Sequence, residues 1–292
     1  MRVLLLGASG HLGSHLADRL ADGFSVAVAP RVDVEDVRAL EGLLDDGAPE
    51  VIVNAIGAAP TAAHRVLDAV NAEFPRRLAA LAVARRARVV HISTDGVFSG
   101  RRGEYAERDA PDPADAYGRS KLAGELAAPH LTIRTTFFGR NHRGTGLVEW
   151  IAASRASRID GFADYRFSGI AAALAADLVV AAIEARLEGV YHVGGEPISK
   201  YELVRSIAAL LRPDLAVVPV ERGAVDRTLE SSRFFSAVGR VRPALADSLQ
   251  NLGVGADPCA CPERSSFDRL RTSGRRVGPG RTRGSAPTTP PR

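Results

Sequence analysis

Two residues suited to acid–base chemistry, Tyr117 and Lys121, stand four positions apart in a stretch with helical spacing. Side chains at this spacing share one face of a helix. An ammonium near a phenol favours the phenolate, so we expect Lys121 to lower the pKa of Tyr117 and to help it exchange a proton near neutral pH. Thr94, with Asp95 beside it, lies at the end of an apolar run of strand length. Its hydroxyl could hydrogen-bond the substrate carbonyl oxygen with which Tyr117 would exchange a proton. We therefore predict that Thr94, Tyr117 and Lys121 are catalytic and interconvert a carbonyl and an alcohol.

A glycine pattern lies upstream, between a strand-like run and a helical stretch, at Gly7, Gly10 and Gly13. Glycines there allow a tight turn and let the backbone approach a pyrophosphate at the positive end of the helix. The alternative is a glycine-rich turn without a ligand, and a Tyr–Lys pair alone is often fortuitous. Because the motifs occur together and in this order, we favour a bound nicotinamide dinucleotide. Its contacts are expected at Gly7, Ser9, Gly10, His11, Leu12 and Gly13.

The residues after the second predicted strand bear on the choice between NADH and NADPH. Dinucleotide folds often place an acid there for the ribose 2′-hydroxyl, whereas this chain has Arg31 and no acid before Asp33. A guanidinium suits a 2′-phosphate, so NADP is the predicted cofactor and NADPH is favoured over NADH; the alternative is a solvated arginine. Asn54 follows the third strand and could equally be a turn-former. Further cofactor contacts are expected at Arg31, Asp33, Val34, Asn54, Ala55, Ile56, Tyr117 and Lys121.

Apolar runs of strand length alternate with helical patterns through the first half of the chain. The expected strands are 2–6, 25–29, 51–53, 89–92 and 131–134, and the expected helices are 11–20, 34–44, 62–84 and 117–126. Continuous rather than alternating apolar runs, separated by helices, indicate a parallel sheet covered on both faces. We therefore predict an α/β protein with a Rossmann-type, doubly wound parallel sheet.

The pattern changes after Gly139. Residues 140–169 are rich in Gly, Arg and Ser, and they precede an expected helix 171–185, a strand 189–193 and a helix 199–211 that opens with a capping-box pattern. We expect the strand to re-enter the sheet. The NAD(P)-binding domain then comprises residues 1–139 and about 170–195, and a small C-terminal α/β substrate lobe comprises residues 140–169 and 196–250. Residues 251–292 have almost no apolar periodicity and are expected to be a disordered tail.

Fewer candidate site residues lie in the second half. Trp150 and Tyr165 could stack on a base or a sugar, and Arg140 or Arg143 could pair with a diphosphate. For each of them the alternative is a partly buried ring or a solvated charge, and the sequence alone slightly favours that alternative. The histidines show no metal-ligand spacing, so we predict no metal site.

The overall charge of +4 comes from the end of the chain. Residues 253–292 hold eight Arg and three acids, a net of +5, which leaves −1 for residues 1–252. This near-neutral body argues against nucleic acid as a partner. The most apolar helical stretch is too short to span a bilayer, and the N-terminus has no signal-peptide pattern. Cys259 and Cys261 are too close for a zinc knuckle. We predict a cytoplasmic protein with no membrane partner.

Together, the three motifs resemble the extended short-chain dehydrogenases/reductases. Within them the chain is similar to the dTDP-4-dehydrorhamnose reductase family over roughly residues 1–245, most specifically at ISTDGVFSG (92–100), YGRSKLAGE (117–125) and VNA (70–72). The resemblance implies NAD(P)H-dependent reduction of a 4-keto sugar nucleotide, as in dTDP-rhamnose and polysaccharide biosynthesis. It also implies that Tyr117 is the proton donor, that Lys121 holds the nicotinamide ribose and tunes Tyr117, and that Thr94 polarises the keto group. The same resemblance adds Asp95, beside Thr94, to the predicted catalytic residues.

The chain departs from this family at Gly96, where the family commonly has Tyr, and this leaves the identity of the sugar open. Two other functions stay open as well. One is an NAD-dependent sugar-nucleotide epimerase or dehydratase that keeps its cofactor bound. The other is a non-catalytic NADP-binding regulatory subunit, like that of methionine adenosyltransferase. Intact Thr94, Tyr117 and Lys121 argue against the regulatory subunit, whereas Gly96 keeps it open. The expected partners are a nucleotide-sugar substrate and a second copy of the chain in a homodimer.

Overall fold

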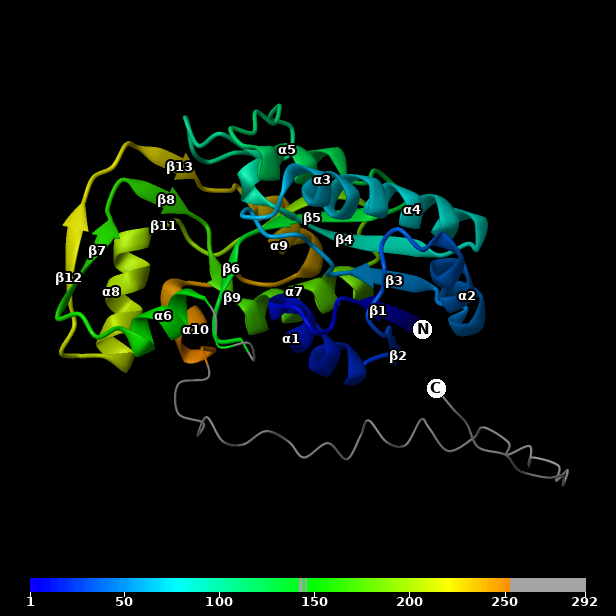
Figure 1. The fold of residues 1–292 in the computed structure, drawn as a ribbon, viewed down its shortest axis with the longest axis horizontal. Helices are drawn as coiled ribbons and strands as arrows, with labels where there is room; N and C mark the ends of the chain where they lie inside the picture. The colour runs from blue at the N-terminus through cyan, green and yellow to red at the C-terminus, as the bar shows by residue number, and fades with distance from the viewer. Residues whose placement is uncertain (142–143, 145, 253–292) are drawn as a thin grey trace, which may run out of the picture. The chain divides into compact units, whose positions relative to one another are not determined.

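A sheet of six parallel strands organises the protein, whose computed structural model describes residues 1–141, 144 and 146–252 (Figure 1). The strands are β1 Arg2–Leu6, β2 Ser25–Val28, β3 Val51–Asn54, β4 Arg88–Thr94, β5 Leu131–Thr135 and β10 Gly189–Val193. They lie in the order β10-β5-β4-β3-β1-β2, and each is parallel to its neighbours. The predicted α/β class is confirmed, and residues 189–193 do re-enter the sheet beside β5.

Helices cover both faces of this sheet. They are α1 His11–Ala21, α2 Val37–Gly47, α3 His64–Leu67, α4 Phe74–Ala84, α5 Ala116–Ala123, α7 Ala172–Glu184 and α9 Ser232–Val238. Figure 1 shows α3, α4 and α5 above β4 and β5, α1 and α7 below these strands, and α2 to the right of β1 and β3. In β1, Val3 and Leu5 join the core under α1 and α7, whereas Leu4 and Leu6 join the core under α2 and α4. Since alternate side chains of a strand point to opposite faces, a strand covered on both sides must be apolar throughout.

The strand order places several loops at one edge of the sheet. The chain passes from β1 to β2 on one side and then to β3 on the other side of β1, and ligands of open α/β sheets bind at such a switch point, outside the carboxyl ends of the strands. Leu6 of β1 is paired with Asn54 of β3, and Asn54 with His91 of β4. The glycine loop, the Asn54 turn and the end of β4 therefore follow one another along this edge.

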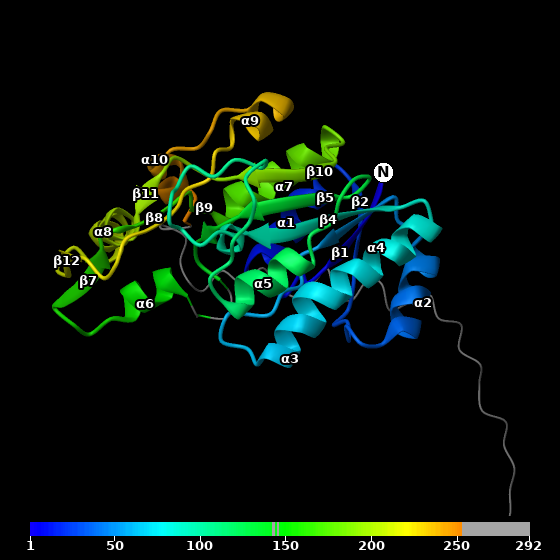
Figure 2. The same ribbon diagram turned by 90° about the horizontal axis from the view of Figure 1, so that it is seen from above.

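Three smaller sheets and three helices form the rest of the described fold, which we call the α8 region after its longest helix, α8 Lys200–Leu211. The strands are β6 Phe137–Phe138, β7 Arg158–Phe162, β8 Tyr165–Phe167, β9 Ile170–Ala171, β11 Ile198–Ser199, β12 Ala216–Val220 and β13 Val225–Arg227, and the helices are α6 Leu147–Ala153, α8 Lys200–Leu211 and α10 Leu245–Gln250. Figure 2 shows α8, β7 and β12 beyond one end of the large sheet. A separate core that includes Leu203 and Ile207 holds them together. The domain boundaries given above stay a prediction.

Three helices differ in extent from the sequence prediction. The helix expected at 34–44 begins at Val37 because the Asp36 carboxylate accepts a hydrogen bond from the Ala39 amide at 3.0 Å and caps it there. The helix expected at 62–84 is interrupted by a π-helical turn, Asp68–Glu73, and the helix expected at 117–126 ends at Ala123. The predicted capping box of α8 is confirmed, with the Ser199 hydroxyl accepting from the Glu202 amide.

Residues 140–169, to which the sequence pattern assigned no regular element, contain α6, β7 and β8. These elements are short, and their partners are distant in the chain: Arg158 of β7 pairs with Ala216 of β12. Leu252, predicted to belong to the tail, is buried with 2% exposure in the core around α8, so the tail prediction is wrong at that residue. The rest of the predicted tail, with both cysteines, lies outside the described residues, as does Arg143.

Candidate active site

The glycine loop between β1 and α1 is folded tightly against the end of β3. Gly7 has a φ of +84°, and a Cβ there would come within 2.8 Å of the Ala55 carbonyl carbon and the Ile56 nitrogen. A Cβ on Gly13 would lie 2.0 Å from the Gly7 carbonyl oxygen. Both positions therefore need glycine. Since α1 begins just after this loop, its N-terminus lies at the same edge of the sheet, and the backbone there fits the pyrophosphate of a dinucleotide.

The remaining residues predicted in this loop differ in their placement. The Leu12 side chain is 4% exposed and packs in the core with Leu16, so a cofactor contact at Leu12 would come from its backbone. The His11 ring lies edge-on to Phe137, with 5.4 Å between the ring centroids. Ser9 is exposed on the loop. The cradle for a ligand is thus made mainly of backbone, as the glycine spacing predicts.

Arg31 is exposed just beyond β2, in a segment that its neighbours anchor to the fold. The Asp33 carboxylate accepts a hydrogen bond from the Glu35 amide at 3.0 Å. The Val34 carbonyl oxygen accepts one from Arg77 Nη1 at 2.9 Å. Asp33 and Val34 therefore fix the course of the backbone, and Arg31 presents its guanidinium to solvent.

Asn54 is fully buried at the end of β3. Its Oδ1 accepts a hydrogen bond from the Ile56 amide at 3.1 Å, and its Nδ2 lies 3.2 Å from Nδ1 of His91. Burial holds the pKa of His91 well below its ordinary value, so this imidazole is neutral and its Nδ1 can accept from Asn54. The Asn54 side chain therefore fixes the turn that packs on Gly7, as the turn-forming alternative expects.

Thr94, Asp95 and Tyr117 meet at the carboxyl end of β4. Thr94 Oγ1 accepts a hydrogen bond from the Gly96 amide at 3.0 Å and donates one to Asp95 Oδ1 at 3.1 Å. The Tyr117 side chain also hydrogen-bonds Thr94. Asp95 is 7% exposed, and its burial raises the pKa of its carboxyl group. The structure therefore brings together the hydroxyl, the phenol and the carboxyl group that the sequence predicted.

Lys121 lies one helical turn after Tyr117 and is 5% exposed. Its Nζ donates a hydrogen bond to the Ile92 carbonyl oxygen at 2.6 Å. Burial lowers the pKa of this ammonium to about 8, against the opposing charge of Glu125. A Cβ on Gly57 would lie 4.0 Å from Nζ. The small residue thus leaves room beside the ammonium, which fits the hydroxyls of a cofactor ribose.

The expected lowering of the Tyr117 pKa is wrong for this structure. Burial raises the pKa of this phenol, the negative charges of Asp95 and Asp115 raise it further, and the hydrogen bond with Thr94 acts in the opposite direction. The Lys121 ammonium is directed to the Ile92 carbonyl oxygen instead. A raised pKa keeps the phenol protonated at neutral pH, and the protonated phenol is the form that donates a proton.

Asn71 is a buried residue of the site to which the sequence analysis gave no role. It lies in the π-helical turn, its Oδ1 accepts from the Ala58 amide at 2.9 Å, and its Nδ2 donates to Ser120 Oγ at 3.1 Å. The side chain therefore ties the loop after β3 to α5, the helix that carries Tyr117. In the sequence, Asn71 stands out only as part of the family-like segment VNA (70–72). Its place in a π-helical turn, a feature that is frequent at functional sites, could not be predicted from the hydrophobic pattern.

Near Asp95, Tyr165 of β8 is grouped with two cations. The Lys200 ammonium lies 3.5 Å from the centroid of the Tyr165 ring, and Arg227 Nη1 donates to Tyr165 Oη at 3.5 Å. The charge of Asp95 acts on both Tyr165 and Lys200. The predicted substrate residue Tyr165 thus lies with the catalytic group, and Lys200 and Arg227, which the sequence analysis missed, lie with it.

Trp150 and Arg140 are not joined to this group by any contact among the described residues. Trp150 lies on α6 and is 51% exposed. Arg140 is half-buried, and its Nε has no hydrogen-bond partner within the described part of the chain. Their predicted roles in substrate binding stay predictions.

Known proteins resemble this chain in both sequence and fold. Residues 1–233 match the family described as RmlD substrate binding domain. The chain belongs to this RmlD family. A relative in Streptomyces antibioticus, named as a probable dTDP-4,6-dihydroxy-2-methyloxan-3-one 4-ketoreductase, is 33% identical over 83% of this chain and 88% of its own length.

Solved structures agree with this assignment to the RmlD family. A hypothetical dTDP-4-dehydrorhamnose reductase from Sulfolobus tokodaii is 30% identical, with a TM-score of 0.72 over 81% of this chain and 94% of that chain. The fold is also shared with dTDP-4-dehydrorhamnose reductase from Bacillus anthracis str. Ames in complex with NADP, at 24% identity and a TM-score of 0.78 over 88% of this chain and 99% of that chain. The predicted membership of the extended short-chain reductases is confirmed.

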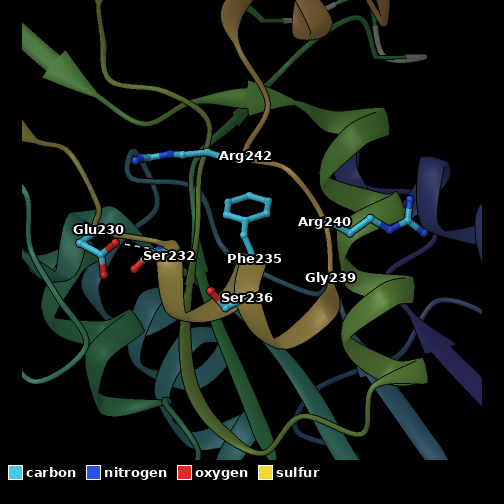
Figure 3. Close-up of a pocket in the computed structure, with 7 residues that line it drawn as sticks. All are labelled: Glu230, Ser232, Phe235, Ser236, Gly239, Arg240 and Arg242. Atoms are coloured by element: carbon cyan, nitrogen blue, oxygen red, sulfur yellow. Dashed lines mark hydrogen bonds between the residues drawn. The ribbon is translucent and has the colours of Figure 1, made fainter.

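In this RmlD-family protein a hollow also lies over α9, away from the catalytic residues. Figure 3 shows it between Glu230, Phe235, Arg240 and Arg242. Arg242 Nε donates to the Gly195 carbonyl oxygen at 2.9 Å, and Glu230 Oε1 accepts from the Ser232 amide at 2.7 Å. Two of its charged side chains, Arg242 and Glu230, are thus engaged within the fold, and this hollow is not our candidate site.

The described residues of this RmlD-family chain contain neither a metal-binding group nor a membrane-spanning helix. No group of three or more His, Cys, Asp or Glu residues there is placed to hold a metal ion. None of the described helices is both long and apolar enough to span a bilayer.

Proposed function

We propose that this protein reduces the keto group of a nucleotide-linked 4-keto sugar with NADPH. The observation that carries the proposal is the grouping of Thr94, Tyr117 and the buried Lys121 around the carboxyl end of β4, at the edge of the sheet where the glycine loop also lies. The names of the relatives support the same reaction, since they describe ketoreductases of dTDP-linked sugars.

The reaction adds a hydride and a proton across a carbonyl group. NADPH, when bound, supplies the hydride to the carbonyl carbon. Tyr117 holds the proton, which its raised pKa retains at neutral pH, and releases it to the carbonyl oxygen as the hydroxyl group forms. Thr94 Oγ1 has one proton, which it donates to Asp95 in this structure. When substrate binds, the Thr94 hydroxyl turns from Asp95 and donates this proton in a hydrogen bond to the keto oxygen, which polarises the carbonyl group. Lys121 binds the ribose in the space that Gly57 leaves beside its ammonium.

Arg31→Ala is expected to weaken NADPH binding about 10- to 100-fold and to leave NADH binding unchanged. A charge-assisted hydrogen bond to a phosphate contributes about 1.5–3 kcal/mol, and only NADPH carries the 2′-phosphate. The dissociation constants of both cofactors can be measured by fluorescence titration. Arg38→Ala removes another exposed arginine, on α2, and serves as the control. An equal loss for both cofactors, or a wild-type preference for NADH, contradicts the assignment of Arg31.

We also propose that the protein acts in the cytoplasm, where nucleotide sugars and NADPH are available to it. A homodimer is the assembly we propose for it. Sedimentation equilibrium of the purified protein tests the dimer, because a single species at the monomer mass would contradict it.

The proposed reaction is tested with the purified protein, NADPH and a panel of nucleotide-linked 4-keto sugars. We expect loss of reduced-nicotinamide absorbance in step with an alcohol product that is two hydrogens heavier than the substrate by mass spectrometry. An epimerase would instead carry a tightly held nicotinamide and consume no NADPH overall. A regulatory subunit would bind NADPH without turnover of any ketone. Either of these results would overturn the proposal.

A further inference from the structure

Arg227, the last residue of β13, brings a guanidinium to the catalytic threonine. The point where a Cβ would stand at Gly96 is 3.4 Å from Thr94 Oγ1 and 3.7 Å from Arg227 Nη1. Because residue 96 has no side chain, the guanidinium and the Thr94 hydroxyl face each other across this small gap. The Arg227 side chain is 16% exposed, so it belongs to the wall of the site rather than to the open surface.

This guanidinium is weakly held by the protein. Among the described residues its shortest hydrogen bond is the one of 3.5 Å to Tyr165 Oη, and the Asp115 carboxylate is 4.0 Å away. Its Nε is buried and has no acceptor in the described part of the chain. An arginine has five N–H donors in a fixed fork, so most of the hydrogen-bonding capacity of Arg227 is left for a ligand.

The charges around this gap favour an oxygen acceptor. Lys200 stands over the Tyr165 ring, and both Lys200 and Arg227 act electrostatically on the one buried carboxyl group of Asp95. Asp115, the other acid near Arg227, is 4.0 Å away and 54% exposed, so solvent screens its charge. The two cations beside the buried Asp95 attract an oxygen with lone pairs and repel an ammonium group. A substituent that contacts Arg227 is therefore expected to be a hydroxyl rather than an amine.

We propose that Arg227 determines specificity by hydrogen-bonding the hydroxyl on C3 of the sugar, next to the C4 carbonyl that Thr94 binds. This inference rests on the proposed reduction of a 4-keto sugar nucleotide. Hydrogen bonds of about 2.9 Å from Thr94 and from Arg227 can reach two oxygens on adjacent ring carbons across the gap at Gly96. C4 has two neighbouring ring carbons, C3 and C5. The oxygen on C5 is the ring oxygen, whereas C3 carries a hydroxyl group, so we assign the C3 hydroxyl as the hydrogen-bond partner of Arg227. The substrate class is then a 4-keto sugar with a C3 hydroxyl, in preference to 3-deoxy and 3-amino sugars.

The test compares kcat/KM for a dTDP-linked 4-keto-6-deoxyhexose and for its 3-deoxy analogue. We expect wild type to prefer the 3-hydroxy substrate at least about tenfold, because a site that hydrogen-bonds a hydroxyl discriminates against the analogue without it. Arg227→Gln is expected to reduce this preference at least about fivefold, since it removes the charge and the donor fork. Its activity on the 3-deoxy ketone and its NADPH dissociation constant should stay near those of wild type. Arg222→Gln, which alters an exposed arginine near the end of β12, is the control.

Each outcome of this comparison decides the matter. An unchanged preference in Arg227→Gln, or an equal loss on both substrates, would overturn the role of Arg227 while the reductase function stands. No turnover of either ketone by wild type would overturn the proposed function, and this inference with it. If Arg227→Gln does not fold, Arg227→Lys replaces it. Lysine keeps the charge without the fork, so the inference expects the preference to fall severalfold, and an unchanged preference would overturn it.

Discussion

Tyr117→Phe is expected to lower kcat for ketone reduction by about 10²–10⁴-fold and to leave the dissociation constant of NADPH nearly unchanged. Proton transfer by a positioned side chain typically contributes that factor. The phenol is the proton donor in the proposed reaction, and it stands in hydrogen-bond contact with Thr94. The substitution keeps the ring and removes only the hydroxyl, whereas the glycine loop and Lys121 are untouched. Steady-state kinetics and NADPH titration of the same preparation measure both quantities.

Tyr191→Phe is the matched control for this substitution. Tyr191 is a buried tyrosine of β10 that packs against Phe234, with 6.2 Å between the ring centroids, so it lies in the core rather than at the site. Its variant should keep wild-type kcat. If Tyr117→Phe retains more than about a tenth of the activity, the phenol does not donate the proton and another group must do so.

The sheet and its cofactor edge could be predicted because their signals are local. Strands buried on both faces are continuously apolar, and β1 and β3 show such runs in four and three consecutive residues. The glycine spacing predicts the close approach of Gly13 to Gly7, which are only six positions apart in the sequence. The short strands of the α8 region gave no such signal, because each is stabilised by a partner far away in the sequence.

The candidate catalytic residues were predicted from their types and spacing, but the direction of the Tyr117 pKa shift was not. Helical spacing places Tyr117 and Lys121 on one face, yet it does not say where the ammonium points, and Ile92 of the neighbouring strand captures it. The sign of the Tyr117 pKa shift depends first on burial and also on the charge of Asp95, which only the fold brings close to Tyr117; Asp115, two residues before Tyr117, acts in the same direction. For the same reason, Arg227 reached the site without a sequence signal, more than a hundred residues after Thr94.

Lys121→Met is expected to abolish turnover and, at the same time, to make the stability of the protein less dependent on pH. Burial lowers the pKa of Lys121 to about 8, whereas a lysine of the unfolded chain has a pKa of about 10.4. Between these values the unfolded state binds more protons than the folded state, so wild-type stability rises as the pH increases from about 8 to about 10.4. Below pH 8 the buried ammonium costs about 3 kcal/mol relative to the unfolded chain. Methionine fills a similar volume and carries no charge.

Urea unfolding of wild type and Lys121→Met at pH 7 and pH 10 tests this expectation. The free energy of unfolding of wild type minus that of the variant should increase by about 2 kcal/mol from pH 7 to pH 10, because only wild type has a buried ammonium that loses its proton in this range. Arg119→Met removes an exposed cation from the same helix, and its difference from wild type should stay constant. The comparison between pH values isolates the titration from the hydrogen bond to Ile92 that the variant also loses. If the difference between wild type and Lys121→Met does not change with pH, Lys121 titrates as an ordinary lysine, and the ammonium beside Gly57 is solvated rather than buried.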